Sequence, residues 1–219
     1  MMQRMFSPLI VLAMIVFVCA PVFIAWAPYE STMGLVQKIF YFHLPSWAAM
    51  FVAAFVCGIA SVVFLFKGRV MADRIAVASA ELAVVFGLIG LVSGPLWARK
   101  AWGVWWQWDA RLTMALVLWM IFVAYLLLRE YGGPGSEKLA AGVALFGMAN
   151  VPFVYWSVNV WRTVHPTTNV VPTLVAGMRG PLWWSLVGFL LLYASAMMVR
   201  VRLEEQRAAL ERVYRELDD

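Results

Sequence analysis

Long apolar segments, separated by short stretches that hold most of the charged residues, occur six times along the chain. The segments cover residues 9–26, 47–66, 75–97, 112–128, 139–156 and 182–199. Each is close to the roughly 20 residues that an α-helix needs to cross a bilayer. The pattern therefore predicts an all-α polytopic membrane protein, in which residues 1–219 form a single domain of six transmembrane helices.

The first apolar segment has some features of a signal peptide, since Arg4 precedes it and Ala25-Trp26-Ala27 resembles a cleavage site. Its apolar run, however, is longer than a usual signal core, and Pro28 follows the expected cut directly. We therefore expect a retained helix.

Composition supports a membrane protein and excludes several functions. Hydrophobic residues make up 64% of the chain and charged residues 13%, whereas soluble domains carry about 25% charged residues. The net charge of +5 is explained by topology, so we expect a lipid bilayer and no nucleic acid as partner. Cys19 and Cys57 lie in apolar segments without a CxxC or CxxCH motif, which argues against a thiol oxidoreductase or a c-type cytochrome.

Lysine and arginine are divided unequally between the two sides of the predicted bundle. With six helices, both termini share a side with residues 67–74 and 129–138, and this side carries eleven of the 17 basic residues. Because basic residues accumulate on the cytoplasmic side, we expect both termini to be cytoplasmic. The outward loops then cover about 27–46, 98–111 and 157–181.

Two charged features fall on the predicted cytoplasmic side. Residues 200–219 carry leucines at heptad spacing among dense charges, which predicts that the last helix continues as a cytoplasmic tail, either solvated or docked on a partner. Glu81 is the one acidic residue well inside an apolar segment. We expect it to form a structural pair, with Arg74 on the same helical face, or to serve a functional or subunit contact.

Tryptophan is concentrated in the stretch WGVWWQWDARLT, residues 102–113, between the third and fourth segments. On the predicted topology, eleven of the 12 tryptophans lie in the outward half. An aromatic belt explains some of them, but a belt predicts tryptophan at both interfaces. The asymmetry favours a ligand surface. If the stretch is helical, Trp102, Trp105, Trp106 and Asp109 share one face and Trp108 points elsewhere.

The residue types in this stretch indicate the ligand. Large flat π-systems suit a large flat partner, and Gly103 permits its close approach. Arg99, Lys100 and Arg111 flank the stretch and can bind anionic groups. Asp109 is expected to pair with Arg111, to cap the fourth helix or to accept from an indole N–H. A flat aromatic ligand with carboxylates on its edge describes haem.

The two histidines of the chain, His43 and His165, both fall in predicted outward loops, one on each side of the tryptophan stretch. Because imidazole is a common axial ligand of haem iron, we expect both to bind the iron, although a lone loop histidine is more often incidental. A b-type cytochrome also uses two histidines, but it buries them inside facing helices. A structural permease subunit would need neither the histidines nor the tryptophans.

Residues Trp102-Gly103-Val104-Trp105-Trp106-Gln107-Trp108-Asp109 match WGxxWxWD, the WWD signature of haem-handling proteins in cytochrome c biogenesis. The chain resembles the CcmC family, the haem exporter proteins C of the system I pathway. The resemblance covers nearly the whole chain: its length, the six helices, the position of the motif and one histidine in each flanking loop. The larger CcmF and CcsA types share the motif but are expected to carry more helices or further domains.

The resemblance implies a protein of the bacterial cytoplasmic (inner) membrane that binds haem b non-covalently at its periplasmic face. It implies the following site: His43 and His165 on the iron, with Trp102, Trp105, Trp106, Trp108 and Asp109 as the platform. The haem would pass to the periplasmic chaperone CcmE, with CcmD assisting and with the ABC transporter subunits CcmA and CcmB as partners. No Walker motif is present, so any ATP use is expected from a partner. We expect no enzyme, although a part in attaching haem covalently to CcmE stays open.

Overall fold

The computed structural model of the protein describes residues 2–167 and 170–218, and helices dominate it. In chain order the elements are α1 (Met2–Trp26), the 3-10 turn η1 (Leu35–Ile39), α2 (Phe40–Lys67), α3 (Val70–Ala101), α4 (Ala110–Tyr131), α5 (Ser136–Val160), the short α6 (Val170–Thr173) and α7 (Ala176–Asp218). Six helical segments in these residues are long and apolar enough to cross a membrane. The predicted all-α membrane protein with six long helices is confirmed.

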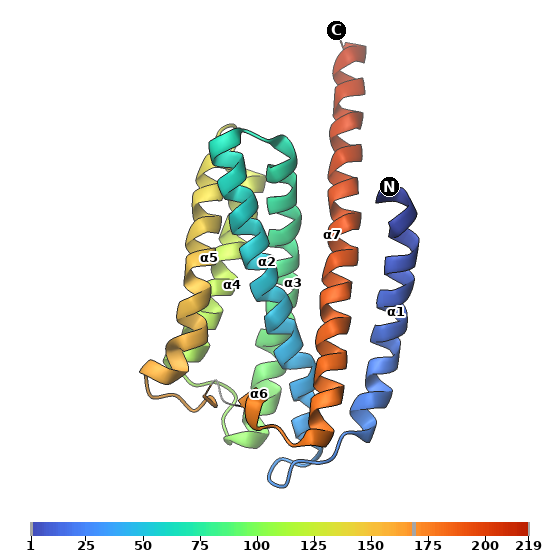
Figure 1. Cartoon of the computed structure of the whole chain (residues 1–219). Helices are drawn as coiled ribbons and strands as arrows, with labels where there is room; N and C mark the ends of the chain where they lie inside the picture. Colours follow the sequence, from blue (N-terminus) through green and yellow to red (C-terminus); the bar gives the residue numbers. More distant parts are fainter. Residues whose placement is uncertain (1, 168–169, 219) are drawn as a thin grey trace.

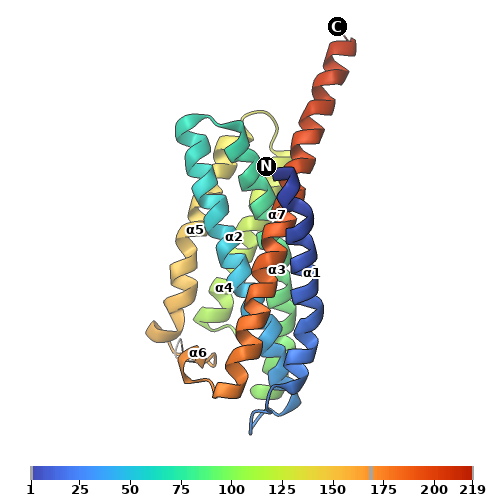
Figure 2. The same cartoon turned by 45° about the vertical axis from the view of Figure 1, so that its right-hand side comes forward.

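The long helices stand roughly parallel and form two groups (Figure 1). Helices α2, α3, α4 and α5 pack together, while α1 and α7 lie side by side next to them (Figures 1 and 2). Both termini lie at the same end of the molecule as the α2–α3 and α4–α5 turns (Figure 1). The other three connections, which contain η1, the tryptophan stretch and α6, lie at the opposite end, called the loop end below.

Most helices extend further than their apolar segments. The largest difference that affects the site is in α2, which begins at Phe40 instead of at residue 47, so that His43 lies on the helix and not in the loop before it. Pro45 lies just before the apolar segment 47–66 and inside α2, where a proline removes one backbone donor, but proline is tolerated in membrane helices. Helix α2 therefore continues through it toward η1.

Small residues allow α2 and α3 to pack closely near the loop end. A Cβ atom added to Gly90 of α3 would lie 2.5 Å from the Trp47 ring of α2, so the indole occupies the space that any larger residue would fill. A small residue at a helix interface lets the neighbouring helix pack closely against it, here through the Trp47 side chain. This contact holds the first turns of α2, and with them His43, against α3.

Glu81 does form a structural ion pair, but its partner is Arg200 of α7 and not Arg74. Nε and Nη2 of Arg200 both donate to the Glu81 carboxylate, with the Nη2–Oε1 distance 2.6 Å, and Nη2 also donates to Glu204 over 3.0 Å. Such bidentate pairs fix geometry as well as charge. The predicted partner was wrong because periodicity within one helix contains no information about the neighbouring helix.

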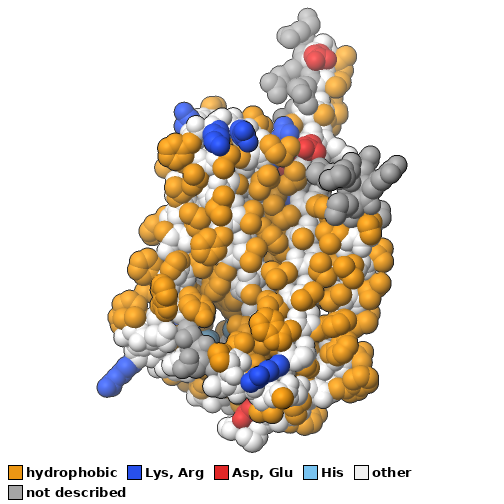
Figure 3. Space-filling model, viewed as in Figure 1, with side chains coloured by type: hydrophobic (Ala, Val, Ile, Leu, Met, Phe, Trp, Pro, Cys, Tyr) orange, Lys and Arg blue, Asp and Glu red, His pale blue; other side chains and the backbone are white. Residues whose placement is uncertain are grey.

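The outer surface is apolar over most of its height, as a bilayer requires. Figure 3 shows hydrophobic side chains over the middle of the molecule and lysine and arginine gathered near the end that carries the α2–α3 turn. Helix α7 continues unbroken to Asp218 and projects beyond the other helices (Figures 1 and 2). Leu203 and Leu210 are exposed on it.

Candidate functional site

A cavity of about 300 Å³ lies at the loop end, at the lower limit of the roughly 300–1,000 Å³ of ligand pockets. Figure 3 shows the molecule hollowed in this region. The lining includes six residues singled out from the sequence: His43, Trp102, Trp105, Trp106, Arg111 and His165. Parts of the chain that are far apart in sequence therefore meet around one space.

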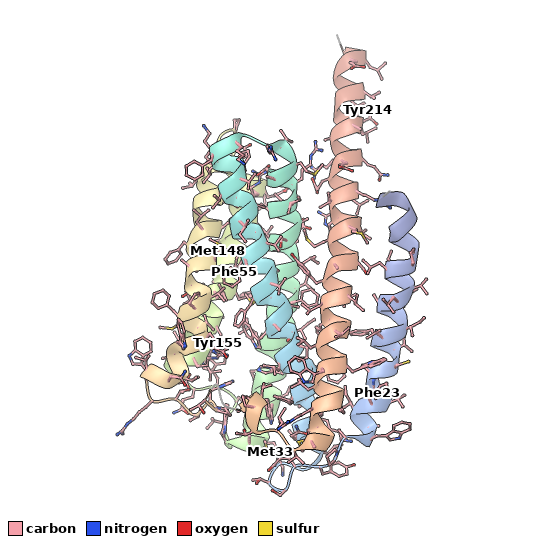
Figure 4. The ribbon with its side chains drawn as sticks, viewed as in Figure 1. Phe23, Met33, Phe55, Met148, Tyr155 and Tyr214 are labelled. Carbon is pink, nitrogen blue, oxygen red and sulfur yellow. The ribbon has the colours of Figure 1, made fainter. Side chains whose placement is uncertain are left out.

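The rest of the cavity wall is mostly apolar. Its larger members are Phe40, Leu44, Trp47, Phe51, Leu91, Trp97, Leu112, Val154, Tyr155 and Val158. Figure 4 shows Met33, a further lining residue, at the loop end and Tyr155 near the same end of α5. An apolar wall with a few polar groups is typical of sites that bind large organic ligands.

The tryptophan stretch is an irregular loop, so the helical geometry considered from the sequence is not present. Helix α3 ends at Ala101 and α4 begins at Ala110. Between them Gly103 has φ = +77°, a conformation that glycine adopts without steric cost. Arg99 Nη1 donates to the Gly103 carbonyl. Gly103 thus makes the turn that follows α3, and it does not line the cavity.

The loop nevertheless presents three of its tryptophans to the cavity. Trp102, Trp105 and Trp106 line it, whereas Trp108 is 75% exposed and lies outside the lining. Trp106 Nε1 is buried and has no hydrogen-bond partner among the described residues. A buried donor without an acceptor costs free energy, so an acceptor on a bound ligand would stabilise this arrangement.

Arg111 is the basic side chain of the motif region that reaches the cavity. Its Nη1 donates to the carbonyls of Val154 and Tyr155 on α5, the latter over 3.2 Å. The guanidinium has five N–H donors, so it can also bind an anionic group of a ligand. Arg99 and Lys100 are exposed and lie outside the cavity lining.

Asp109 connects the tryptophan loop to the loop that carries His165. Its Oδ1 accepts from Leu112 N over 2.9 Å and caps α4, while Oδ2 accepts from Val164 N over 3.1 Å and from the Thr163 hydroxyl. Thr163 Oγ1 in turn accepts from the backbone N–H of His165 over 3.1 Å. Of the three predicted roles, the helix cap is confirmed. Neither an ion pair with Arg111 nor an indole hydrogen bond to Asp109 is found in the described part of the chain.

The two histidines are held by aromatic neighbours. The His43 ring packs edge-on against Trp97 and Trp47, with centroid distances of 5.8 and 6.4 Å, and the His165 ring packs edge-on against Trp102 at 6.1 Å. His43 lies within the candidate span Leu35–Lys67. The expectation that neither histidine lies inside a span, which argued against a b-type cytochrome, is therefore wrong for His43.

The ring nitrogens of His165 have different surroundings. Nδ1 lies 3.0 Å from the carbonyl oxygen of Pro166. Because a carbonyl only accepts, Nδ1 carries the proton of the neutral ring, and the lone pair is on Nε2. This is the nitrogen that remains for a ligand in the cavity.

We expect His165 to be neutral at near-neutral pH. Burial lowers the pKa of His165 below the ordinary value of 6.5, and the Arg111 guanidinium lowers it further. Since unfolding would restore the ordinary pKa, the folded state should lose stability as pH falls through 6.5. An NMR titration of the ¹⁵N-histidine-labelled protein should give a midpoint below 6.5 for His165, and a midpoint at or above 6.5 would contradict the burial of this ring.

Some site residues were not foreseen from the sequence. Ser93 Oγ lies 3.0 Å from His43 Nδ1. Nothing in the sequence indicates that a serine in an apolar segment contacts a histidine of another helix. Thr163 is a polar residue two positions before His165 in a predicted outward loop, so it could have been considered. Trp97 Nε1 donates to Met33 Sδ over 3.1 Å, which joins the loop before η1 to α3.

Comparisons with known proteins identify the family of the chain. A family model described as CcmC, "Heme exporter protein C", matches residues 1–215. The chain is 36% identical over 187 residues to Heme exporter protein C of Escherichia coli (strain K12), covering 81% of this chain and 74% of that protein. It is 34% identical over 187 residues to the protein of the same name from Bradyrhizobium diazoefficiens, covering 82% and 71%, and 31% identical over 189 residues to that of Haemophilus influenzae, covering 83% and 76%. The chain belongs to the haem exporter protein C family.

Proposed function

We propose that this protein binds haem b non-covalently in the loop-end cavity, with His43 and His165 as axial ligands of the iron. The observation that carries the proposal is the meeting of the two histidines of the chain with three tryptophans of the WGxxWxWD motif around one cavity. The name Heme exporter protein C, borne by its relatives, supports haem handling in cytochrome c biogenesis as the role.

The donor set of the cavity fits haem. Apolar and aromatic walls suit the macrocycle, and two neutral imidazoles suit the iron. Arg111 offers a cation to a propionate, and Trp106 Nε1 offers a buried donor that has no acceptor among the described residues. Four exposed residues lie on the rim of the cavity end, where a partner protein or the edge of the ligand would contact them: Arg99 and Lys100 on the last turn of α3, and Gly103 and Trp108 on the tryptophan loop.

The proposed direction of haem transfer depends on the side of the membrane that the loop end faces. We place the protein in the bacterial inner membrane with the cavity facing the periplasm, because the opposite end carries most of the basic residues. The recipient is then the chaperone CcmE, with CcmD, CcmA and CcmB as membrane partners. A transferring protein must release its ligand, whereas an electron carrier of the b-type cytochrome class must retain it.

Haem transfer tests the proposal. Protein loaded with haem in nanodiscs with CcmD is mixed with the haem-free soluble domain of CcmE, and the two are separated before haem is measured in each. We expect haem to move to the chaperone. Haem that stays on the membrane protein under every condition, with CcmA, CcmB and ATP present, would favour an electron carrier and contradict transfer.

A matched pair of variants makes this assay specific to the cavity. Trp105 and Trp156 are exposed to a similar extent, 57% and 61%, but only Trp105 lines the cavity. Trp105→Ala should reduce haem loading and Trp156→Ala should leave it unchanged. Equal losses would indicate that tryptophan serves the membrane interface and not the ligand.

A further inference from the structure

Ser93 of α3 is a polar partner of the His43 ring, beside the backbone of Gly90. Its Oγ lies 3.0 Å from His43 Nδ1, and the contact joins two helices, α2 and α3, beside the cavity. Ser93 itself is absent from the cavity lining, so it reaches a ligand only through His43. Its effect must therefore be on the imidazole.

The hydroxyl proton of Ser93 is already donated to a backbone carbonyl of α3. Oγ donates to the carbonyl of Ile89 over 2.7 Å and lies 3.3 Å from that of Gly90. Serine in an apolar helix commonly donates to the carbonyl four residues earlier. A hydroxyl has one proton and two lone pairs, so Ser93 Oγ faces His43 as an acceptor and the proton between them belongs to Nδ1.

We propose that Ser93 is a positioning residue, which holds neutral His43 as the Nδ1–H tautomer and leaves the Nε2 lone pair for the ligand in the cavity. The tautomer of His43 is inferred from the hydrogen bonds of Ser93. The binding of iron by Nε2 rests on the proposed function. A partner on one ring nitrogen sets which nitrogen can bind a metal, and it also tunes the basicity of the ligand.

The surroundings of His43 restrict the ring in the same way. A Cβ atom added to Gly94 would lie 3.2 Å from His43 Cε1, so the ring rests directly on α3 next to Ser93. Trp97 and Trp47 pack edge-on against it. His165 reaches the same tautomer through the carbonyl of Pro166. Acceptors from different parts of the chain thus favour a proton on Nδ1 and a lone pair on Nε2 in both histidines.

The tautomer can be measured without haem. In the full-length haem-free protein, labelled with ¹⁵N-histidine, the two rings give two sets of nitrogen signals, which His165→Gln assigns. We expect protonated Nδ1 and unprotonated Nε2 for His43. Ser93→Ala should move His43 toward the Nε2–H tautomer that predominates in free histidine, Ser93→Thr should preserve Nδ1–H, and His165 should not change in either. Protonated Nε2 in the unaltered protein, or the same tautomer in Ser93→Ala, would overturn the proposal.

The haem-loaded protein gives a second readout. Loss of an outer partner of a metal ligand costs about 10–100-fold in affinity, so Ser93→Ala should bind haem that much more weakly and Ser93→Thr close to normally. The haem reduction potential should rise in Ser93→Ala, because a less basic imidazole stabilises ferric iron less. Unchanged affinity and potential would overturn the role of Ser93. A protein that has the expected tautomers but takes up no haem would instead overturn the proposed function.

Discussion

Replacing Asp109 with alanine is expected to lower both the stability of the protein and its affinity for haem. Loss of a helix N-cap costs about 0.5–2 kcal/mol, and here Leu112 N at the start of α4 would lose its acceptor. The same change releases Thr163 and Val164, which hold the loop that carries His165. Because the loop that carries the proposed axial ligand His165 loses this support, haem affinity should fall, by up to about the 10–100-fold that the loss of a direct outer partner costs.

Asp109→Asn and Thr163→Val separate the two roles of Asp109. Asparagine is a good N-cap, but its amide has one accepting oxygen, so the N–H of Val164 would face an amide N–H. Thr163→Val leaves the cap intact and removes the link to the backbone of His165. Both variants should unfold at nearly the normal temperature in nanodiscs and bind haem more weakly in a titration. Normal haem affinity in both would show that Asp109 acts only as a cap.

The six helices could be predicted because the bilayer demands long apolar segments. The ends of the helices could not be predicted, because a helix can extend through polar residues and proline beyond the end of its apolar segment. Helix α2 is the consequential case, because its start at Phe40 moves His43 from a loop onto a helix. Glu81 illustrates a second limit: its need for a partner was evident from one segment, but Arg200 lies on α7, far along the chain.

Part of the lining of the cavity could be predicted from the sequence, but its geometry could not. Clustered tryptophans and two flanking histidines indicated a haem site, and the cavity contains three of those tryptophans and both histidines. The tryptophan stretch turns at Gly103 instead of forming a helix, which changes how the rings are presented. The role of Ser93 could not be predicted, because it depends on which helix packs beside α3. The spacing of residues along one segment does not indicate the neighbouring helix.

The two histidine substitutions are expected to have the largest effect on haem. We expect haem-loaded protein to give the absorption spectrum of six-coordinate low-spin iron, as two axial imidazoles produce. His43→Ala or His165→Ala should each abolish that spectrum and weaken binding by at least the roughly 10–100-fold cost of losing an outer partner. Added imidazole should restore part of the signal in the single variants, because it can occupy the vacated position. Trp156→Ala, exposed and outside the cavity lining, is the matched control and should have the unaltered spectrum.

The most direct test of haem ligation in this cavity is the absorption spectrum of the purified protein and of the variant that combines His43→Ala with His165→Ala. Both proteins should be produced with CcmA, CcmB, CcmD and CcmE and purified in the same detergent. We predict low-spin haem in the unaltered protein and no low-spin haem in the double variant. An unchanged haem spectrum in the double variant would contradict the ligand assignment, and an unaltered protein that never carries haem would contradict haem binding itself.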